Sequence, residues 1–303
     1  AVAETLDLAE VICATTTLDE ILLGDRTFDW VVIDEACQST EPGCWIPLQR
    51  GEKFLLAGDH CQLPPTVICD QAGREGYARS MMERLVETYG PKVTRRLEVQ
   101  YRMHAAIMEF SSQEFYDGSL TAHASVAAHT LDDLAHASLG EVPNRPLQFI
   151  DTAGADYDEE QEPDGASRLN PSEGRLTLAK VNELLDSGVQ PGEIGVIAPY
   201  AAQVRWLRQH CDAADVEIDT VDGFQGREKE AIVICLVRSN RTGEIGFLAD
   251  TRRMNVALTR ARRKLIVIGD SATLGGHPFY KDLFEYFELH DAYGSVWEEP
   301  SMW

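Results

Sequence analysis

The sequence predicts an α/β protein, with helices covering both faces of parallel sheets in two domains. Short β-like runs alternate with helical segments through most of the chain, a pattern typical of parallel sheets. Several of these runs end in polar, turn-forming loops, which is where open α/β sheets hold ligands. At 303 residues and 44% hydrophobic, the chain is long enough for one large or two medium cores, and we expect two.

The first predicted domain covers residues 1–92. Its pattern ends near Pro91 and restarts at Val93. Helical spacing of Met81, Met82, Leu85 and Val86 predicts a helix in this part. The β-like runs are residues 11–15, 29–33 and 53–57, and the helical segment is 77–89.

The second predicted domain covers residues 93–290, and residues 291–303 are expected to form a loosely held tail. A helix is predicted from Ala105 to Phe115. A second helix start is marked by Asn170 as N-cap, followed by Pro171 and Glu173. The predicted strands are residues 147–151, 194–198, 216–221, 231–237 and 264–269.

Composition limits the environment of the chain. The sequence has no run of 18 or more apolar residues and no basic start with an apolar core, so neither a membrane span nor a signal peptide is indicated. The seven cysteines show no Cys-x-x-Cys spacing, and free thiols in a reducing compartment are the simplest account. We therefore expect a cytoplasmic protein.

The charge is strongly acidic. Lys plus Arg is 27 and Asp plus Glu is 50, which gives a net charge of −23, whereas nucleic-acid binders usually present a basic face. Either the acids form a solvated coat around a local positive track of arginines, or this chain makes few phosphate contacts. In both cases the overall field slows association with a polyanion. Part of the excess lies in residues 156–164, which are expected to form a surface loop.

Two acids follow an apolar strand near the start of the chain. Asp34 and Glu35 come directly after three β-branched residues, so they are expected at the carboxyl end of a buried parallel strand. Transfer of a γ-phosphoryl group needs Mg²⁺ and an acceptor that orients the attacking water. Asp34 is the candidate metal ligand and Glu35 the candidate base. The alternative for this pair alone is two solvated acids at a strand end.

Other segments supply the groups that such a reaction needs. Gln62, in the loop after the run 53–57, can reach a γ-phosphate as an uncharged sensor. Arg102 and Arg260 are candidate arginine fingers, although either one alone is also compatible with a surface ion pair. Gly226 lets the backbone approach a ligand, and Glu228 can accept from a ribose hydroxyl.

Taken in order, these segments resemble motifs II to VI of the superfamily 1 helicases. The similarity is closest to subclass B, in the branch of the nonsense-mediated-decay and immunoglobulin-mu-binding helicases, and it covers most of the chain. The segments that carry it are Asp34–Gln38, Gly58–Pro65, Gln100–His104, Val221–Glu228 and Val256–Arg262.

The resemblance implies two RecA-like domains of the P-loop NTPase type, the first of them incomplete, with ATP in the cleft between them. Residues 1–92 would be the C-terminal part of domain 1A and residues 93–290 domain 2A. Members of the family translocate 5′ to 3′ on single-stranded RNA or DNA. The implied roles are Mg²⁺ binding by Asp34, base catalysis by Glu35, γ-phosphate contacts by Gln62, Arg102 and Arg260, adenine stacking by Tyr101, and ribose binding by Glu228.

The resemblance also implies contacts to a nucleic-acid strand, where hydroxyls and amides would grip phosphates. The alternative is that the threonines are ordinary β residues, which is the more frequent role of threonine in or near a strand. The candidates are Thr15, Thr16, Pro199, Tyr200, Gln203 and Thr220.

One departure from the family is large. Its first motif is a Gly-x-x-x-x-Gly-Lys-Ser/Thr loop (Walker A) that cradles the phosphates, and no Gly-Lys dipeptide occurs in this sequence. We therefore expect the chain to be part of a larger protein whose Walker A segment lies upstream of Ala1. The isolated chain is expected to bind ATP weakly and to hydrolyse it negligibly.

Three functions remain open at this point. The first is part of a helicase motor. The second is a nucleotide- or nucleic-acid-binding module that has lost hydrolysis. The third is an unrelated phosphohydrolase that uses Asp34 and Glu35 with a metal ion.

Overall fold

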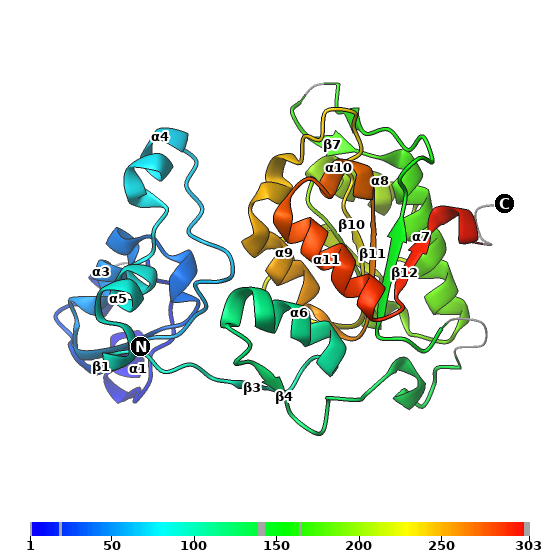
Figure 1. The fold of residues 1–303 in the computed structure, drawn as a ribbon. Helices are drawn as coiled ribbons and strands as arrows, with labels where there is room; N and C mark the ends of the chain where they lie inside the picture. Colours follow the sequence, from blue (N-terminus) through cyan, green and yellow to red (C-terminus); the bar gives the residue numbers. More distant parts are fainter. Residues whose placement is uncertain (1, 18–19, 139–142, 164, 300–303) are drawn as a thin grey trace. The chain divides into compact units, whose positions relative to one another are not determined.

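The computed structural model describes residues 2–17, 20–138, 143–163 and 165–299 (Figure 1). The chain divides into two compact units, Ala1–Arg96 and Leu97–Trp303, and each is described by itself. Parallel sheets with helices between their strands confirm the predicted α/β fold class. Among the described helices, none has the length and apolarity that a bilayer crossing needs.

The first unit is built around a parallel pair of strands. β1 (Phe28–Ile33) pairs with β2 (Gly51–Leu56), and α3 (Glu41–Leu48) connects them. α5 (Met81–Tyr89) begins after Ser80, whose side chain accepts a hydrogen bond from the Glu83 amide. The short helices are α1 (Val2–Leu8), α2 (Glu20–Leu23) and α4 (Asp70–Ala72). The buried core cluster consists of Ile33, Ala36, Cys44, Leu48 and Met81.

The predicted strand at residues 11–15 is wrong. These residues have no regular structure, and the Val11 side chain is 77% exposed. β-branched residues favour a strand only where a neighbouring strand can pair with them. In the described part of this unit β1 and β2 pair with each other, and the segment 11–15 pairs with neither.

The second unit contains a six-stranded sheet in the order β12-β5-β11-β10-β8-β9, and every neighbouring pair is parallel. β8 is wholly apolar, and β10 and β11 run as unbroken apolar stretches from Ala231 and Leu265, because both faces of the sheet are covered. The strand bounds are β5 Leu147–Asp151, β8 Ile194–Ala198, β9 Glu217–Thr220, β10 Lys229–Cys235, β11 Ala261–Gly269 and β12 Tyr293–Ser295.

Helices form a layer on each face of this sheet (Figure 1). α7 packs on α8, whereas α6 packs on α9 and on β11. The Asn170 side chain accepts from the Glu173 amide at 3.0 Å, so the predicted start of α7 is confirmed. The bounds of the helices are α6 Ala105–Tyr116, α7 Pro171–Asp186, α8 Ala201–His210, α9 Thr251–Leu258, α10 Ser271–Leu274 and α11 Pro278–Leu289.

Part of the expected tail belongs to the sheet. β12 pairs with the outer edge of β5, and the Tyr293 hydroxyl donates to the Asp151 carboxylate at 2.6 Å. The ring of Tyr293 also lies 5.0 Å from that of Phe149. Pairing of an otherwise open strand edge explains why these residues are held. Residues 300–303 of the expected tail lie outside the described residues.

The acidic segment 156–164 is also more ordered than expected, although Asp164 is outside the described residues. Within it, β6 (Glu160–Gln161) pairs antiparallel with β7 (Arg168–Leu169). Glu159 accepts a hydrogen bond from the Arg238 guanidinium at 2.7 Å, and both side chains are buried. A charge count alone does not reveal that one acid in the run is needed inside the fold.

Candidate functional site

In the first unit, the loops that follow β1 and β2 lie at the same edge of the sheet. The parallel pairing continues past the strands, because Ala57 N donates to Ile33 O at 2.9 Å and Ala36 N donates to Ala57 O at 2.8 Å. A Cβ at Gly58 would lie only 3.1 Å from the Ala36 nitrogen, so glycine permits this close approach. The segments that carry Asp34, Glu35 and Gln62 therefore belong to one edge.

Glu35 has an unusual backbone. Its φ of 51° and ψ of 39° are left-handed, a conformation that costs a non-glycine residue about 1 kcal/mol or more. The Glu35 amide donates to the Asp34 carboxylate at 3.0 Å, and the Glu35 carboxylate accepts from the Gln38 side chain at 2.8 Å. Both acids are exposed. Non-glycine residues held in this region cluster at functional loops.

Gln62 has a partner that the sequence analysis did not consider. Its side-chain amide donates to the Asp59 carboxylate at 2.8 Å, and the other Asp59 oxygen accepts from the Cys61 amide at 3.0 Å. Asp59 therefore fixes the turn and orients Gln62. The motif places Asp59 three residues before Gln62, but residue type alone does not say which of its neighbours the carboxylate will bind.

In the second unit, three predicted segments that are far apart in the sequence meet. The Arg102 guanidinium pairs with the Glu228 carboxylate through Nε, and its Nη1 donates to the Thr259 carbonyl at 3.0 Å. The turn around Arg102 is closed by Gln100, whose side-chain oxygen accepts from the amides of Arg102 and Met103, both at 2.7 Å. Arg102 therefore forms an ion pair in this structure, which is the alternative that the sequence analysis left open for it.

Arg260 is held in a different way. It is only 3% exposed, and its Nε donates to the Val256 carbonyl at 3.0 Å at the end of α9. Its Nη2 donates to the Thr259 hydroxyl at 3.2 Å. A buried guanidinium held by backbone and hydroxyl oxygens is not the surface ion pair that was the alternative for this residue.

Tyr101 presents an aromatic surface. The residue is 63% exposed, and its ring stacks on the His123 ring, with centroids 4.4 Å apart. His123 was missed by sequence reasoning because it lies outside the recognised motif. β3 (Val99–Gln100) and β4 (Thr121–Ala122) pair in parallel and bring the two rings together.

Glycine at position 226 is explained by the backbone conformation and not by a lack of space for a side chain. Its φ is +73°, and a Cβ there would meet no atom within 4 Å. Glu228, two residues later, faces Arg102 and also lies 3.8 Å from the Arg262 Nε.

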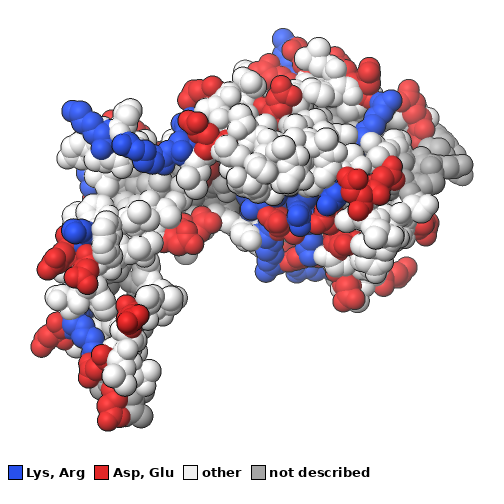
Figure 2. All heavy atoms as spheres, turned by 90° about the horizontal axis from the view of Figure 1, so that it is seen from below, with Lys and Arg blue, Asp and Glu red and all other residues white. Residues whose placement is uncertain are grey.

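Basic and acidic side chains are interspersed on the face of the second unit shown in Figure 2, with no single basic patch.

Two of the predicted nucleic-acid contacts disagree with the structure. Gln203 is fully buried, and its side-chain amide exchanges hydrogen bonds with the Asn170 backbone at 2.7 and 3.2 Å. Tyr200 is 3% exposed, and its hydroxyl accepts from Arg238 at 3.1 Å. Both side chains hold the fold around the start of α8 and have no surface to offer a strand.

The other nucleic-acid candidates remain compatible with a surface role. Thr15 is exposed in an irregular segment of the first unit, where Thr16 follows in a turn. Pro199 and Thr220 are partly exposed at the carboxyl ends of β8 and β9, on the same edge of the six-stranded sheet. The Thr220 hydroxyl accepts from the Gly223 amide at 3.3 Å.

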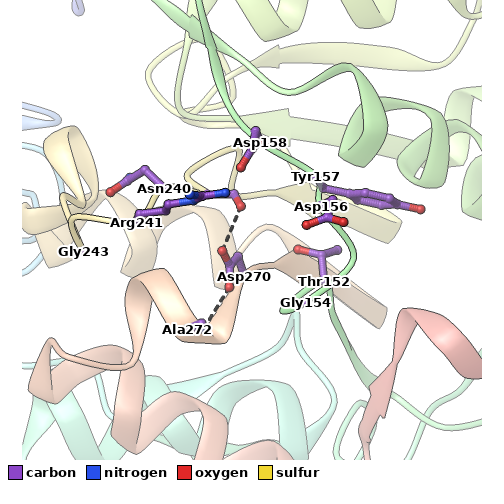
Figure 3. A pocket seen from close by; sticks show the side chains of 11 residues that line it. Thr152, Gly154, Asp156, Tyr157, Asp158, Asn240, Arg241, Gly243, Asp270 and Ala272 are labelled. Atoms are coloured by element: carbon purple, nitrogen blue, oxygen red, sulfur yellow. Dashed lines mark hydrogen bonds between the residues drawn. The ribbon is translucent and has the colours of Figure 1, made fainter.

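An open pocket of about 400 Å³ lies further along this edge, at the ends of β5, β10 and β11 (Figure 3). Asp270 lies in the pocket wall, and both of its carboxylate oxygens accept hydrogen bonds. The donors are the hydroxyls of Ser239 and Thr273 and the amides at the start of α10. Exposed Asp156, Asp158 and Arg241 complete the polar rim. No sequence motif pointed to this pocket.

Comparisons with known proteins identify the family. A model described as an AAA domain matches residues 77–272, and a second model with the same description matches residues 1–70. The chain belongs to the AAA domain family. Within that family, the predicted membership of the superfamily 1 helicase branch is confirmed by the relatives described next.

The relatives of this AAA-domain chain are longer proteins. It is 49% identical to the DNA-binding protein SMUBP-2 of Rattus norvegicus, covering 98% of this chain and 31% of that protein. It is 41% identical to a regulator of nonsense transcripts 1 homolog of Arabidopsis thaliana, covering 93% and 23%, respectively. The chain thus spans about a third or less of the length of these two relatives.

Another relative of the AAA-domain chain is an ATP-dependent helicase of Methanocaldococcus jannaschii, 42% identical over 93% of this chain and 42% of that protein. Among solved structures, a PRRSV helicase is 16% identical with a TM-score of 0.40, covering 81% of this chain and 36% of that one. ATP dependence is stated in the name of the Methanocaldococcus jannaschii relative. The exposed Asp34 carboxylate is the type of oxygen ligand that Mg²⁺ prefers.

Proposed function

We propose that this AAA-domain chain forms part of an ATP-driven helicase or translocase that moves 5′ to 3′ on single-stranded RNA or DNA. The observation that carries the proposal is the cluster of Arg102, Glu228, Thr259 and Arg260 in the second unit. The segment of Arg102 meets there two segments that lie more than a hundred residues later in the sequence, and each of the three contributes a group suited to a nucleotide. The names of the relatives support the same function.

The proposed roles follow from the chemistry of phosphoryl transfer. Asp34 would hold Mg²⁺, and Glu35 would accept the proton of the attacking water. Gln62, Arg102 and Arg260 would contact the γ-phosphate, where negative charge spreads over the oxygens in the transition state. Tyr101 would stack on adenine, Gly226 would allow close approach, and Glu228 would release Arg102 and bind the ribose.

The phosphate cradle would come from another segment of the same protein. The 303 residues contain no Gly-Lys dipeptide. Both strands of the first unit also leave large apolar side chains about half exposed, at Trp30, Val32, Phe54 and Leu55. Strands of an α/β sheet are normally covered on both faces, so these side chains support further sheet and helix from the rest of the protein.

The proposal is tested with the complete protein and its Glu35→Gln variant. Loss of the base should lower nucleic-acid-stimulated ATP hydrolysis about a hundredfold or more, while binding of a non-hydrolysable ATP analogue is retained. Glu52→Gln, a change of the same kind at an exposed acid on β2, should leave hydrolysis unchanged. Full ATPase activity in Glu35→Gln would remove Glu35 from its role.

Strand displacement by the wild-type complete protein tests the motor itself. Duplexes with a 5′ single-stranded tail should be opened and those with a 3′ tail should not, and RNA and DNA versions compare the two nucleic acids. A complete protein that binds ATP and nucleic acid without turnover would support the alternative, a hydrolysis-deficient binding module. The missing cradle in these 303 residues is the observation that keeps this alternative in view.

We also propose a cytoplasmic location. The described cysteines are all free thiols, and Cys37, Cys44 and Cys235 are buried where no disulfide is formed. Such usage is typical of a reducing compartment. Imaging of the tagged complete protein in cells tests this assignment.

A further inference from the structure

The turn that follows β2 gathers three different metal-binding side chains. Asp59, His60 and Cys61 are consecutive, and the turn is closed by a hydrogen bond from the Gln62 amide to the Asp59 carbonyl at 3.1 Å. One ligand atom of each of the three side chains lies within 4.8 Å of the other two. All three residues are partly exposed, so an ion from solvent can reach them.

The type of these atoms selects a transition metal. A thiolate, an imidazole nitrogen and a carboxylate oxygen are the ligands of Zn²⁺, at about 2.0–2.3 Å from the ion. Neighbouring ligands of a tetrahedral ion then lie about 3–4 Å apart, so the observed arrangement needs a closure of about 1 Å by side-chain rotation. Mg²⁺ prefers oxygen ligands and would favour the Asp34 carboxylate over this set.

The surroundings restrict the fourth ligand. The Cys37 thiol is buried, and its sulfur lies 3.4 Å from the position of a Cβ at Gly58, in the strand end that leads into this turn. The Cys37 sulfur is instead in contact with that of Met82 at 3.5 Å. A water molecule is therefore the expected fourth ligand.

We propose that Asp59, His60 and Cys61 form a Zn²⁺-binding site with one position open to water. Both Asp59 oxygens are already used, one by the Cys61 amide and the other by the Gln62 side chain. Coordination of Zn²⁺ by Asp59 competes with these bonds and frees or reorients Gln62. The metal site stands on the side-chain geometry alone, whereas its effect on catalysis rests on the proposed role of Gln62.

Cobalt and zinc titrations of the 303-residue chain test the site. Co²⁺ should bind one equivalent with a thiolate-to-cobalt absorption band, and Zn²⁺ should displace it. Cys61→Ser should abolish the band and weaken Zn²⁺ binding at least about tenfold, and His60→Gln should weaken it similarly. Cys69→Ser, at an exposed cysteine of the same unit, should change neither. Circular dichroism of each variant checks that the fold is kept.

The proposal is overturned if the wild type shows no thiolate-to-cobalt band, or if the band survives in Cys61→Ser. A second measurement separates the site from its consequence. Zn²⁺ should inhibit ATP hydrolysis by the complete protein and inhibit Cys61→Ser at least about tenfold less, each relative to its own rate without zinc. Binding without inhibition would keep the metal site and reject the link to Gln62. A complete protein without ATPase activity would reject the proposed function and leave the titration result standing.

Discussion

At the scale of single residues, Glu173 shows how far position can change the role of a side chain. The sequence identifies it as a helix-start residue, yet it is fully buried. Its carboxylate accepts hydrogen bonds from the Val237 amide at 2.8 Å, the Thr152 hydroxyl at 3.1 Å and the Cys235 thiol at 3.5 Å. These donors favour the charged form, but burial outweighs them and raises the pKa of Glu173 to about 8.

Glu173→Gln should therefore change how stability depends on pH. The folded state keeps the proton up to pH 8, whereas the unfolded chain loses it near its ordinary value of 4.5. Between these values the unfolded state is favoured increasingly, so wild-type stability should fall as pH rises, by up to about 1.4 kcal/mol per pH unit from this group. Melting temperatures from pH 5 to 8 should fall more steeply for wild type than for Glu173→Gln.

The matched control is Glu160→Gln, at an exposed acid of β6. Its melting curve should follow the wild type across the same pH range. Parallel pH profiles of wild type and Glu173→Gln would show that the buried carboxyl does not retain its proton in the folded state.

At the scale of elements, the β3–β4 pair fixes the aromatic surface beside the arginines. The His123 amide donates to the Gln100 carbonyl at 2.9 Å, which places the imidazole against Tyr101. The His123 ring is held in turn by Ser125, through its amide at 3.2 Å and its hydroxyl at 2.9 Å. One face of Tyr101 is therefore covered by His123, and the other is the face on which an adenine would stack.

His123→Ala should loosen Tyr101 and raise the KM for ATP of the complete protein several-fold, with kcat little changed, because base stacking contributes about 1 kcal/mol or more to binding. His123→Phe keeps an aromatic ring at this position and should restore most of the affinity. His136→Ala, at a histidine paired with Glu193 on the surface, is the control. An unchanged KM in His123→Ala would mean that Tyr101 does not need this support or does not bind adenine.

The elements that sequence predicts well are those whose signals are local. The strands at 147–151 and 194–198 were located to the residue, because each is a short apolar run bounded by turn-forming residues. The start of α7 follows from the N-cap Asn170 and the proline after it. The segment 11–15 has the same type of apolar run but no pairing partner in the described residues, and it forms no strand.

The sequence predicts which residues belong to the site better than it predicts the contacts that they make. Arg102, Glu228 and Arg260 were singled out by type and order, and the structure brings them together through Thr259. Sequence gives no direction for a side chain, so the burial of Tyr200 and Gln203 was missed. His123 was missed because its partner lies on another strand, and strand pairing is a tertiary property.

At the scale of the whole molecule, part of the acidic charge forms ion pairs with arginines of the same chain. Arg262 pairs with Glu230 at 2.8 Å, Arg263 pairs with the same carboxylate at 2.6 Å, and Arg102 pairs with Glu228. The guanidinium groups near the proposed nucleotide site are thus neutralised locally by acids of the same unit. A bound triphosphate would have to displace acids, and Mg²⁺ would offset the added negative charge.

The two units differ greatly in the size of their cores, and this difference predicts separate unfolding. The described core cluster of the first unit has five buried residues, whereas one described cluster of the second unit has 21, and further buried residues of that unit such as Phe149 and Leu283 lie outside it. A small core supplies less burial per ordered residue, so the first unit should unfold at the lower temperature. Calorimetry of the 303-residue chain should therefore show two transitions.

One variant in each core assigns the transitions. Ile33→Ala should lower only the first, and Leu176→Ala only the second, since removing a buried aliphatic side chain costs about 2–5 kcal/mol. Limited proteolysis between the two temperatures should leave a resistant fragment that begins near Leu97, where the second unit starts. A single transition that shifts with either substitution would show that the two units unfold together, and the stability of the first unit would then have to come from contacts beyond its own core.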